Sequence, residues 1–424
     1  MIKDQIYIAI ISLIVLDLFS CKNYTNNFIS FDDDDEIATI TSDSESEFLD
    51  AIDKLYSEGG TIYIDTPVIN INKSSSVVIG STKIGGVIGI RQPNGEYPRI
   101  DFMRSSSGFR ISGSNKFIEN IIIENVKDVG VAVTGDNNIL VHVISRYNYG
   151  SGFEVSGNFN LLKYCYSYRN YHSNKDKTFI FSDGFSVSGK LNNILNYCFA
   201  WDNGYSGFAN KLTNSSELSY LHCGSWNNGN IDIFTGKYDY DNGNPLDKKL
   251  WTIKEIMDSD PNFETNYYNK KYNVDDAYME GLPVKERIAN ILLLDGSGFS
   301  FTNYISDEII VDAKRNLLYC VAFEHISGGF INRYNQRFIA YVDHCISFNN
   351  DVNYKLSSTF TEWFKNFSWG SKNKDQLNKV TTKIPSNTAT TEKTIYSVRE
   401  QIVKAVYANK FPDNINFDVA FGRI

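Results

Sequence analysis

Residues Cys198–Phe208 read Cys-Phe-Ala-Trp-Asp-Asn-Gly-Tyr-Ser-Gly-Phe, and the chain contains several variants of this stretch. Each variant begins at a cysteine, and most are followed by a Gly-Phe pair. The cysteines in question are Cys165, Cys198, Cys223, Cys320 and Cys345. Cys198 and Cys223 are 25 residues apart, and so are Cys320 and Cys345. A fixed period of this size is typical of a solenoid, in which each repeat forms one coil of the fold.

The residues around the cysteines predict which solenoid this is. Segments such as Asn120–Glu124 and Ile139–Val143 are rich in β-branched residues and have the two-residue alternation of strands. Between such segments lie Asn, Asp, Gly and Ser, which favour turns. None of these connections is long enough to hold a crossover helix. The pattern therefore predicts an all-β fold, a parallel β-helix with three short strands in each coil.

In a coil of this kind, equivalent positions of successive repeats stack on one another. We expect the five repeat cysteines to be small, buried, apolar residues of the core, stacked coil upon coil. Their odd number favours free thiols, although a bridge between neighbouring coils is geometrically conceivable. Asn203, Asn228 and Asn350 recur in the same way, and we expect them to form an inward polar ladder of hydrogen bonds.

The first 21 residues have the features of a targeting segment. Lys3 provides a positive charge and Ile6–Leu16 an apolar stretch that is too short to span a bilayer. The segment ends in Leu18-Phe19-Ser20-Cys21, which resembles a bacterial lipoprotein signal, although an ordinary secretory signal or an uncleaved anchor stays possible. We therefore expect an exported protein, held on a membrane by acyl chains on Cys21, at the cell surface or in the periplasm.

Residues 22–46 are acidic and rich in serine, with a run of four aspartates from Asp32 to Asp35. Such a segment cannot bury a core and is predicted to be a solvated tether. Calcium binding is the alternative, but four successive aspartates cannot all point at one ion. Phe48, Leu49, Ile52 and Leu55 then share one helical face, and Gly59 ends the helix. This short helix is expected to cap the open N-terminal end of the core.

Four segments follow from these boundaries: a signal (1–21), a tether (22–46), a β-helix domain (47–356) and a C-terminal cap (357–424). The β-helix period is interrupted at 236–290, which we interpret as one long insertion in a coil turn. With 42% hydrophobic and 14% aromatic residues, the chain can build a large core. The formal net charge of −9 argues against nucleic acid as a partner.

The repeats resemble polysaccharide lyase family 9. The resemblance covers roughly residues 115–356 and rests most strongly on the coil that runs from Lys314–Phe323 to Gly328–Asn335. Asp183-Gly184-Phe185, Cys198–Phe208 and Asp295–Ser300 follow the order of that family's site motifs. The resemblance implies a right-handed, pectin lyase-like β-helix that acts on or binds a uronate glycan.

The resemblance also implies which residues would form the site. The family performs β-elimination with a lysine base and with aspartates that hold Ca²⁺. Here the lysine position is Ser300, and the calcium motif reads Gly204–Ala209, with Tyr205, Ser206 and Ala209 at its ligand positions. Of the expected aspartates only Asp183 remains. A serine without a neighbouring base is a poor proton acceptor, so a non-catalytic relative is favoured. No cofactor is then expected, and Ca²⁺ is expected only if the chain is an active lyase.

Other candidate residues have simpler explanations. Lys190 and Lys211 could replace the base, but their spacing places them at turns as surface residues. Asp202 and Asp295 could rebuild a cation site with Asp183, although aspartate is also a common turn residue. His222 and His344 each precede a repeat cysteine, at a position where other coils have tyrosine. That equivalence predicts an outward strand position for both histidines and not a metal site.

Three functions stay open at this point. The first is a surface lipoprotein that binds a glycan, or an envelope or host partner, without catalysis. The second is an active lyase or glycosidase with a relocated site, completed by the insertion, with Asp275 and Asp276 as candidate acid and base. The third is a structural surface protein. Calcium-dependent elimination would favour the second function, and saturable glycan binding without turnover would favour the first.

Overall fold

A computed structural model describes most of the chain outside its N-terminal segment and its central insertion. The described residues are 36–72, 75–103, 108–148, 150–170, 182–211, 216–229, 296–302, 313–325, 327–332, 338–356, 360–375, 382–412 and 415–421. The predicted signal, residues 22–35 of the predicted tether and the predicted insertion at 236–290 lie outside them. Residues 37–424 form one compact unit.

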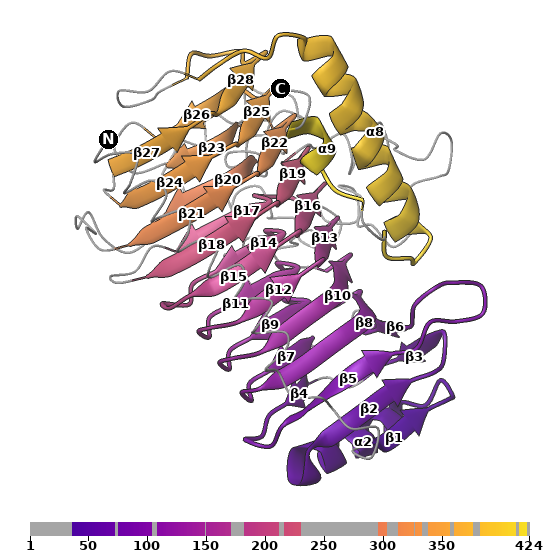
Figure 1. The fold of residues 1–424 in the computed structure, drawn as a ribbon. Helices are drawn as coiled ribbons and strands as arrows, with labels where there is room; N and C mark the ends of the chain where they lie inside the picture. Colours follow the sequence, from indigo (N-terminus) through magenta and orange to yellow (C-terminus); the bar gives the residue numbers. More distant parts are fainter. Residues whose placement is uncertain are drawn as a thin grey trace, which may run out of the picture. The chain divides into compact units, whose positions relative to one another are not determined.

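The strands of this unit lie in three columns, and every described pairing within a column is parallel (Figure 1). The first column contains β2 (Gly60–Ile64), β5 (Gly85–Gly89), β8 (Lys116–Glu124), β10 (Ile139–Arg146), β12 (Leu161–Lys163), β15 (Asn193–Asn196), β18 (Glu217–Leu221), β21 (Lys314–Leu318), β24 (Ile339–Asp343) and β27 (Phe360–Phe364). The second contains β3 (Val68–Asn70), β6 (Arg99–Asp101), β13 (Tyr166–Tyr168), β16 (Phe199–Trp201), β19 (Gly224–Trp226), β22 (Val321–Phe323), β25 (Ile346–Phe348) and β28 (Phe367–Trp369). The third contains β4 (Val77–Ile79), β7 (Phe109–Ile111), β9 (Val131–Val133), β11 (Phe153–Val155), β14 (Phe185–Val187), β17 (Phe208–Lys211), β20 (Ser297–Thr302), β23 (Gly328–Asn332) and β26 (Val352–Lys355). This arrangement confirms the predicted parallel β-helix.

The corner between the first and second columns is a single residue in the left-handed backbone conformation. Strands β8 and β10 pass through this corner without a break, at Asn120 (φ 58°) and His142 (φ 50°). Their two halves pair with both columns, so the first two columns join into one sheet. The equivalent corner residues of later coils are Tyr164, Tyr197, His222, Tyr319 and His344.

The interior of the coils is filled by rows of stacked side chains. One row in the third column has successive ring centroids 4.7 to 5.1 Å apart, which is close to the spacing of paired strands. It consists of Phe153, Phe185, Phe208, Phe299, Phe330 and Tyr354. Inward residues therefore repeat coil by coil, because each strand places alternate side chains in the core.

An N-terminal helix precedes the first full coil. Helix α2 (Glu45–Glu58) follows β1 (Glu36–Ile40), and the hydroxyl oxygen of Ser44 accepts a hydrogen bond from the Glu47 N–H at its start. Its buried face holds Phe48, Ala51, Ile52 and Leu55, as the sequence pattern predicts. The helix packs against β2, β3 and β4, the strands of the first coil.

The C-terminal segment was expected to cap the end of the solenoid, and its contacts follow the outer side of the second column. Helix α8 (Thr388–Tyr407) lies beside this column in Figure 1. It shares a second apolar cluster with outward residues of the column, including Trp201, Trp226 and Phe348. The segment then reaches Tyr97, whose backbone N–H donates to the Asn409 carbonyl at 2.9 Å. In the part of the chain that the structure describes, no helix is long and apolar enough to cross a bilayer.

A glycine in the second column makes room for the tail. Phe417 lies just before α9 (Asp418–Phe421), and its ring packs edge-on to Phe199 and Trp226 at 5.7 and 5.9 Å. A Cβ on Gly224 would lie only 2.6 Å from the Cε2 atom of Phe417. Gly224 therefore forms a notch in an otherwise aromatic surface, and Phe417 fills it.

Candidate functional site

Two of the residues that the family resemblance singles out, Ala209 and Ser300, lie on the outer face of the third column. Alternate residues of its strands point inward, so the residues between them form an outward row across the coils. Strand register places this row as Arg110, Ala132, Glu154, Ser186, Ala209, Ser300, Ile331 and Lys355. The structure thus brings Ala209 and Ser300 side by side, on paired strands β17 and β20.

The row is open at one end and covered in its middle. Arg110 is exposed, and Ala132 and Glu154 are half-buried. Ser186 and Ala209 are 9% and 4% exposed, and Ser300 is only 1% exposed. The hydroxyl of Ser300 has no hydrogen-bond partner among the described residues. A substrate carbon would have no access to this hydroxyl, and no described base could accept its proton.

Asp183 belongs to a second, parallel row at the entrance of the third column. The backbone N–H of Asp183 donates to the Ser151 hydroxyl at 3.3 Å, and the Ser206 N–H donates to the Asp183 carboxylate at 3.1 Å. The hydroxyls of Ser206 and Ser297 lie 2.9 Å apart in the next rung. Asp183 is 2% exposed. Its carboxylate therefore links neighbouring coils within a polar ladder.

These residues do not fit a calcium site. Ca²⁺ binds six to eight oxygens, several of them from carboxylates. Of the four positions that the resemblance supplies, Tyr205, Ser206 and Ala209 carry no carboxylate, and Asp183 accepts from a backbone N–H of the ladder. No group of three or more His, Cys, Asp or Glu residues suited to a metal was found among the described residues. Asp295 lies outside them.

The other candidate carboxylates and lysines lie elsewhere. Asp202 is fully buried at the corner after β16, where its carboxylate accepts from the Asn227 amide at 2.9 Å and lies 3.8 Å from the Arg169 Nε. Lys190 is exposed in a turn after β14. Lys211 ends β17, and its side chain is outside the described part of the structure, as are Asp275 and Asp276. Asp202 therefore has a structural role, because it partners Asn227 and Arg169.

His222 and His344 belong to a row of stacked rings at the first corner. The row contains both histidine and tyrosine, and the centroids of successive rings are 4.6 to 5.2 Å apart. It contains His142, Tyr164, Tyr197, His222, Tyr319 and His344. Asp418 of the tail lies 2.6 Å from the Nδ1 atom of His222 and accepts from the Tyr197 hydroxyl at 2.9 Å. Ring faces are used in stacking, so only ring edges are available for contacts.

The predicted asparagines lie in a continuous buried ladder at the corner between the second and third columns. The Asn203 N–H donates to the Asn228 side-chain oxygen at 2.9 Å, and Asn170 donates in the same way to Asn203. The predicted cysteines are also inward, all five with buried free thiols that donate to backbone carbonyls of the preceding coil. Burial raises the pKa of the Cys165 and Cys198 thiols, so these thiols are poor nucleophiles.

The sequence analysis missed several members of the asparagine ladder, among them Asn170 and His325. His325 occupies the rung between Asn228 and Asn350, and its Nδ1 atom accepts from the Asn228 N–H at 3.3 Å. Its Nε2 atom has no partner among the described residues, and burial lowers the pKa of His325 to about 3. A signal was present, because His325 follows Cys320 by five residues, as Asn350 follows Cys345.

A charged residue inside the coils was also missed. Arg315 is 1% exposed at an inward position of β21, where the equivalent residues of β18 and β24 are Leu218 and Ala340. Its guanidinium donates to the Asn210 amide oxygen and to Ser216 at 3.0 Å. Burial lowers its pKa to about 10. The sequence pattern of β21 does not predict an inward charge, because Arg315 stands at a position where the neighbouring coils have an apolar residue.

Comparisons with known proteins agree with this fold. The family model described as "Pel9A-like, right handed beta helix region" matches residues 27–246, just over half of the chain. The structure of pectate lyase Pel9A is similar, with a TM-score of 0.57, 15% identity, and coverage of 90% of this chain and 88% of that one. A rhamnogalacturonan lyase gives a TM-score of 0.50 at 15% identity, covering 83% and 87% of the two chains. No curated protein sequence matches.

The chain therefore belongs to the Pel9A-like right-handed β-helix family. The structural similarity at 15% identity establishes the shared fold.

Proposed function

We propose that this protein is an exported lipoprotein that binds a uronate-containing glycan on its β-helix without cleaving it. The observation that carries the proposal is the burial of Ser300. This residue stands at the family's base position, is 1% exposed and lies beside Ala209. A β-elimination needs a base near the proton to be removed and a positive charge near the carboxylate. Neither is present among the described residues of this part of the face.

The glycan is proposed to bind at the open end of the third-column outer face. Arg110 is exposed there, and Ala132 and Glu154 continue the row. Ala132 is small, so an extended chain could lie flat along the strands while Arg110 faces a carboxylate. The names of the relatives, pectate lyase and rhamnogalacturonan lyase, support an acidic glycan as the ligand class. Cys21, which lies outside the described residues, would hold the protein on a membrane.

The first experiment tests catalysis and binding together. The full chain, purified in detergent, is incubated with polygalacturonate in the presence of Ca²⁺ or of a chelator. Elimination would appear as absorbance of unsaturated uronide ends, and binding is measured in parallel by calorimetry. We expect saturable binding without absorbance change. A calcium-dependent absorbance would overturn the non-catalytic function and favour an active lyase with a relocated site.

Two variants locate the binding. Arg110→Gln should weaken polygalacturonate binding about tenfold at low salt, since it removes a cation from the open face. Lys163→Gln is the control, because Lys163 is a cation on another outer face, that of the first column, where it is half-buried. Equal effects of the two changes would show non-specific attraction. If the full chain fails to bind any acidic glycan, a structural role is favoured instead.

A third variant tests the closed site itself. Ser300→Lys restores the family's base residue but neither the carboxylates nor access to solvent. We expect it to remain without elimination activity. Activity in Ser300→Lys would show that the cation site and the substrate path are intact, contrary to the geometry described above.

A further inference from the structure

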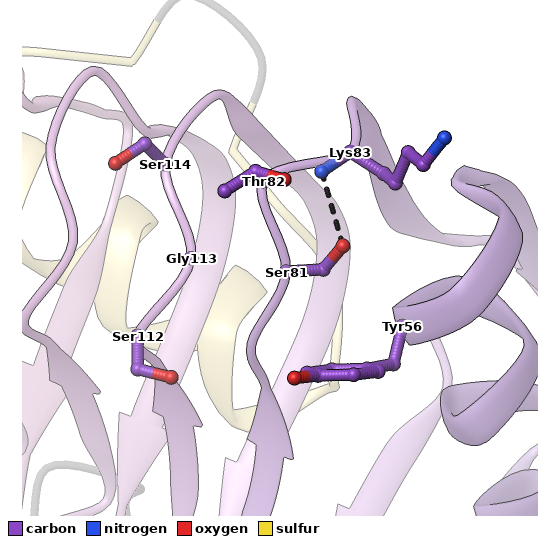
Figure 2. Close-up of a pocket in the computed structure, with 7 residues that line it drawn as sticks. All are labelled: Tyr56, Ser81, Thr82, Lys83, Ser112, Gly113 and Ser114. Atoms are coloured by element: carbon purple, nitrogen blue, oxygen red, sulfur yellow. Dashed lines mark hydrogen bonds between the residues drawn. The ribbon is translucent and has the colours of Figure 1, made fainter.

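A hollow of about 430 Å³ lies at the N-terminal end of the β-helix, away from the covered middle of the third-column face (Figure 2). Three segments form it: helix α2, the turn after β4 and the turn after β7. Its lining consists of Tyr56, Ser81, Thr82, Lys83, Ser112, Gly113 and Ser114. None of these side chains is a carboxylate, and five carry a hydroxyl group.

The hollow arises from one extra residue in a turn. Strand register pairs Ile79 with Ile111 and Gly85 with Lys116. Five residues (80–84) therefore connect the strands in the first coil, and four (112–115) in the second. The longer turn takes Ser81 to a φ of 133°, a conformation that side chains rarely adopt. The Ser81 hydroxyl oxygen accepts from the Lys83 N–H at 3.0 Å, which holds the turn in this shape.

Tyr56 provides a flat apolar platform at this place. Its side chain is 61% exposed, although aromatic rings usually bury most of their surface. A Cβ on Gly80 would lie 3.3 Å from the Cε2 atom of the ring, so the absence of a side chain there lets the ring lie against the turn. Figure 2 shows the ring extending from α2 toward Ser112, beneath Ser81. The ring is thus held in place while much of it faces solvent.

Polar groups surround this platform. The Ser114 hydroxyl oxygen accepts from the Asp136 N–H at 3.2 Å, which leaves its own O–H free to donate in another direction. Lys83 also lines the hollow, and Figure 2 draws its side chain extending away from Ser112 and Ser114. Lys116, 1% exposed, donates its amine to the Lys83 carbonyl. Several hydroxyls and the turn that carries Lys83 therefore surround an exposed ring.

We propose that this hollow binds the carboxylated sugar at the end of an acidic saccharide. The apolar C–H face of the sugar stacks on Tyr56, and its hydroxyls bond to the serines and Thr82. Its carboxylate pairs with Lys83 once that side chain turns toward the hollow. An aromatic ring, hydroxyl donors and a cation without a competing carboxylate match these three parts of the ligand. The inference does not require the third-column face to bind a polymer.

The test measures binding of galacturonate and of galactose, its neutral counterpart, to the full chain by ligand-observed NMR. Galacturonate should bind about tenfold more tightly than galactose at low salt. Tyr56→Ala should weaken both sugars about tenfold. Lys83→Met should weaken galacturonate to the level of galactose and leave galactose unchanged.

The controls are an aromatic residue and a lysine that are exposed on other turns. Phe159→Ala and Lys190→Met should bind both sugars as the parent chain does, and thermal unfolding verifies that all four variants are folded. Parental affinity in Tyr56→Ala and Lys83→Met, or no binding of galacturonate at tens of millimolar, would overturn the inference. Arg110→Gln separates this site from the proposed polymer site, because it should weaken polygalacturonate and leave galacturonate binding unchanged.

Discussion

The second and third columns are built from the same kind of parallel strands, but their outer faces carry different side chains. On the second, rings stack coil upon coil through Tyr168, Trp201 and Trp226 at 4.7 and 4.9 Å, and the C-terminal tail covers them. On the third, the equivalent outward row contains small residues such as Ser186 and Ala209. Strand register alone therefore does not decide what a face does. The size and charge of the outward residues divide the molecule into a face that packs against the C-terminal tail and a face of small residues, at whose open end we propose that a glycan binds.

The buried ion pairs of the second column give the largest expected effect. Glu124 is fully buried and pairs with Arg99 at 2.7 Å and with Arg146 at 2.6 Å. Glu124→Gln should lower the free energy of unfolding by about 3–5 kcal/mol, because Arg146 would stay buried without a counter-charge. Denaturant unfolding measures this change.

The matched change on the third column is Glu154→Gln. Glu154 is half-buried on the outward row, so the expected change is within about 0.5 kcal/mol. Equal losses for the two substitutions would contradict the division between the two faces.

The notch at Gly224 gives a smaller effect that is confined to the tail. Gly224→Val should displace Phe417 and cost about 1–3 kcal/mol through overpacking. Limited proteolysis should then cut the C-terminal tail first, and the fluorescence of Trp226 should shift toward that of an exposed indole.

A double-mutant cycle with Phe417→Ala tests this explanation. Once the ring is absent, Gly224→Val should cost much less than it does alone. Additive losses would mean that Gly224 is needed for some other reason.

The third effect concerns the corner where the two faces meet. His325 has a pKa of about 3 in the folded state, below its ordinary value of 6.5. At pH values between these two pKa values, His325 is therefore protonated in the unfolded chain but neutral in the folded chain. Stability should fall as the pH drops from about 6.5 toward 3, by up to about 1.4 kcal/mol per pH unit from this residue.

His325→Asn should remove that part of the pH dependence and restore the asparagine ladder. At pH 8 we expect it to raise the free energy of unfolding by about 1 kcal/mol, because the unpartnered Nε2 group disappears. Thermal unfolding across pH compares the two chains. Parallel pH profiles would show that His325 accepts a proton readily and that its surroundings are more polar than described.

The smallest effect is expected at the end of the outward row of the third column. Lys355→Gln changes a half-buried side chain beside Ile331 and should alter stability by less than about 0.5 kcal/mol. Calorimetric unfolding provides the measurement. A loss above 1 kcal/mol would show that this face, too, holds structure.

The repeated part of the fold could be predicted because its information is local and periodic. The spacing of the cysteines and the offset from each cysteine to its asparagine identify the coil and its inward residues. The outward position of His222 followed from the tyrosines that replace it in other coils, and its stacked ring agrees. These inferences need only one repeat to be compared with the next.

What could not be predicted depends on residues that are distant in sequence. The position of α8 follows from pairs such as Gly224 and Phe417, and neither residue alone indicates the other. The burial of Ser300 depends on what covers the face, although the resemblance to polysaccharide lyase family 9 singled out the position itself. The N-terminal hollow depends on one extra turn residue and on the position of α2. No sequence motif therefore indicates it.

The C-terminal tail also affects how the molecule folds and unfolds. A solenoid whose coils contact only their neighbours can form one coil at a time and can fray from its ends. Here Asn409 accepts from Arg146 at 2.8 Å and donates to Glu96, across 263 and 313 residues of chain. These contacts form only after Asn409 has been synthesised. Once formed, they should join coils that are otherwise connected in series into a single cooperative unit.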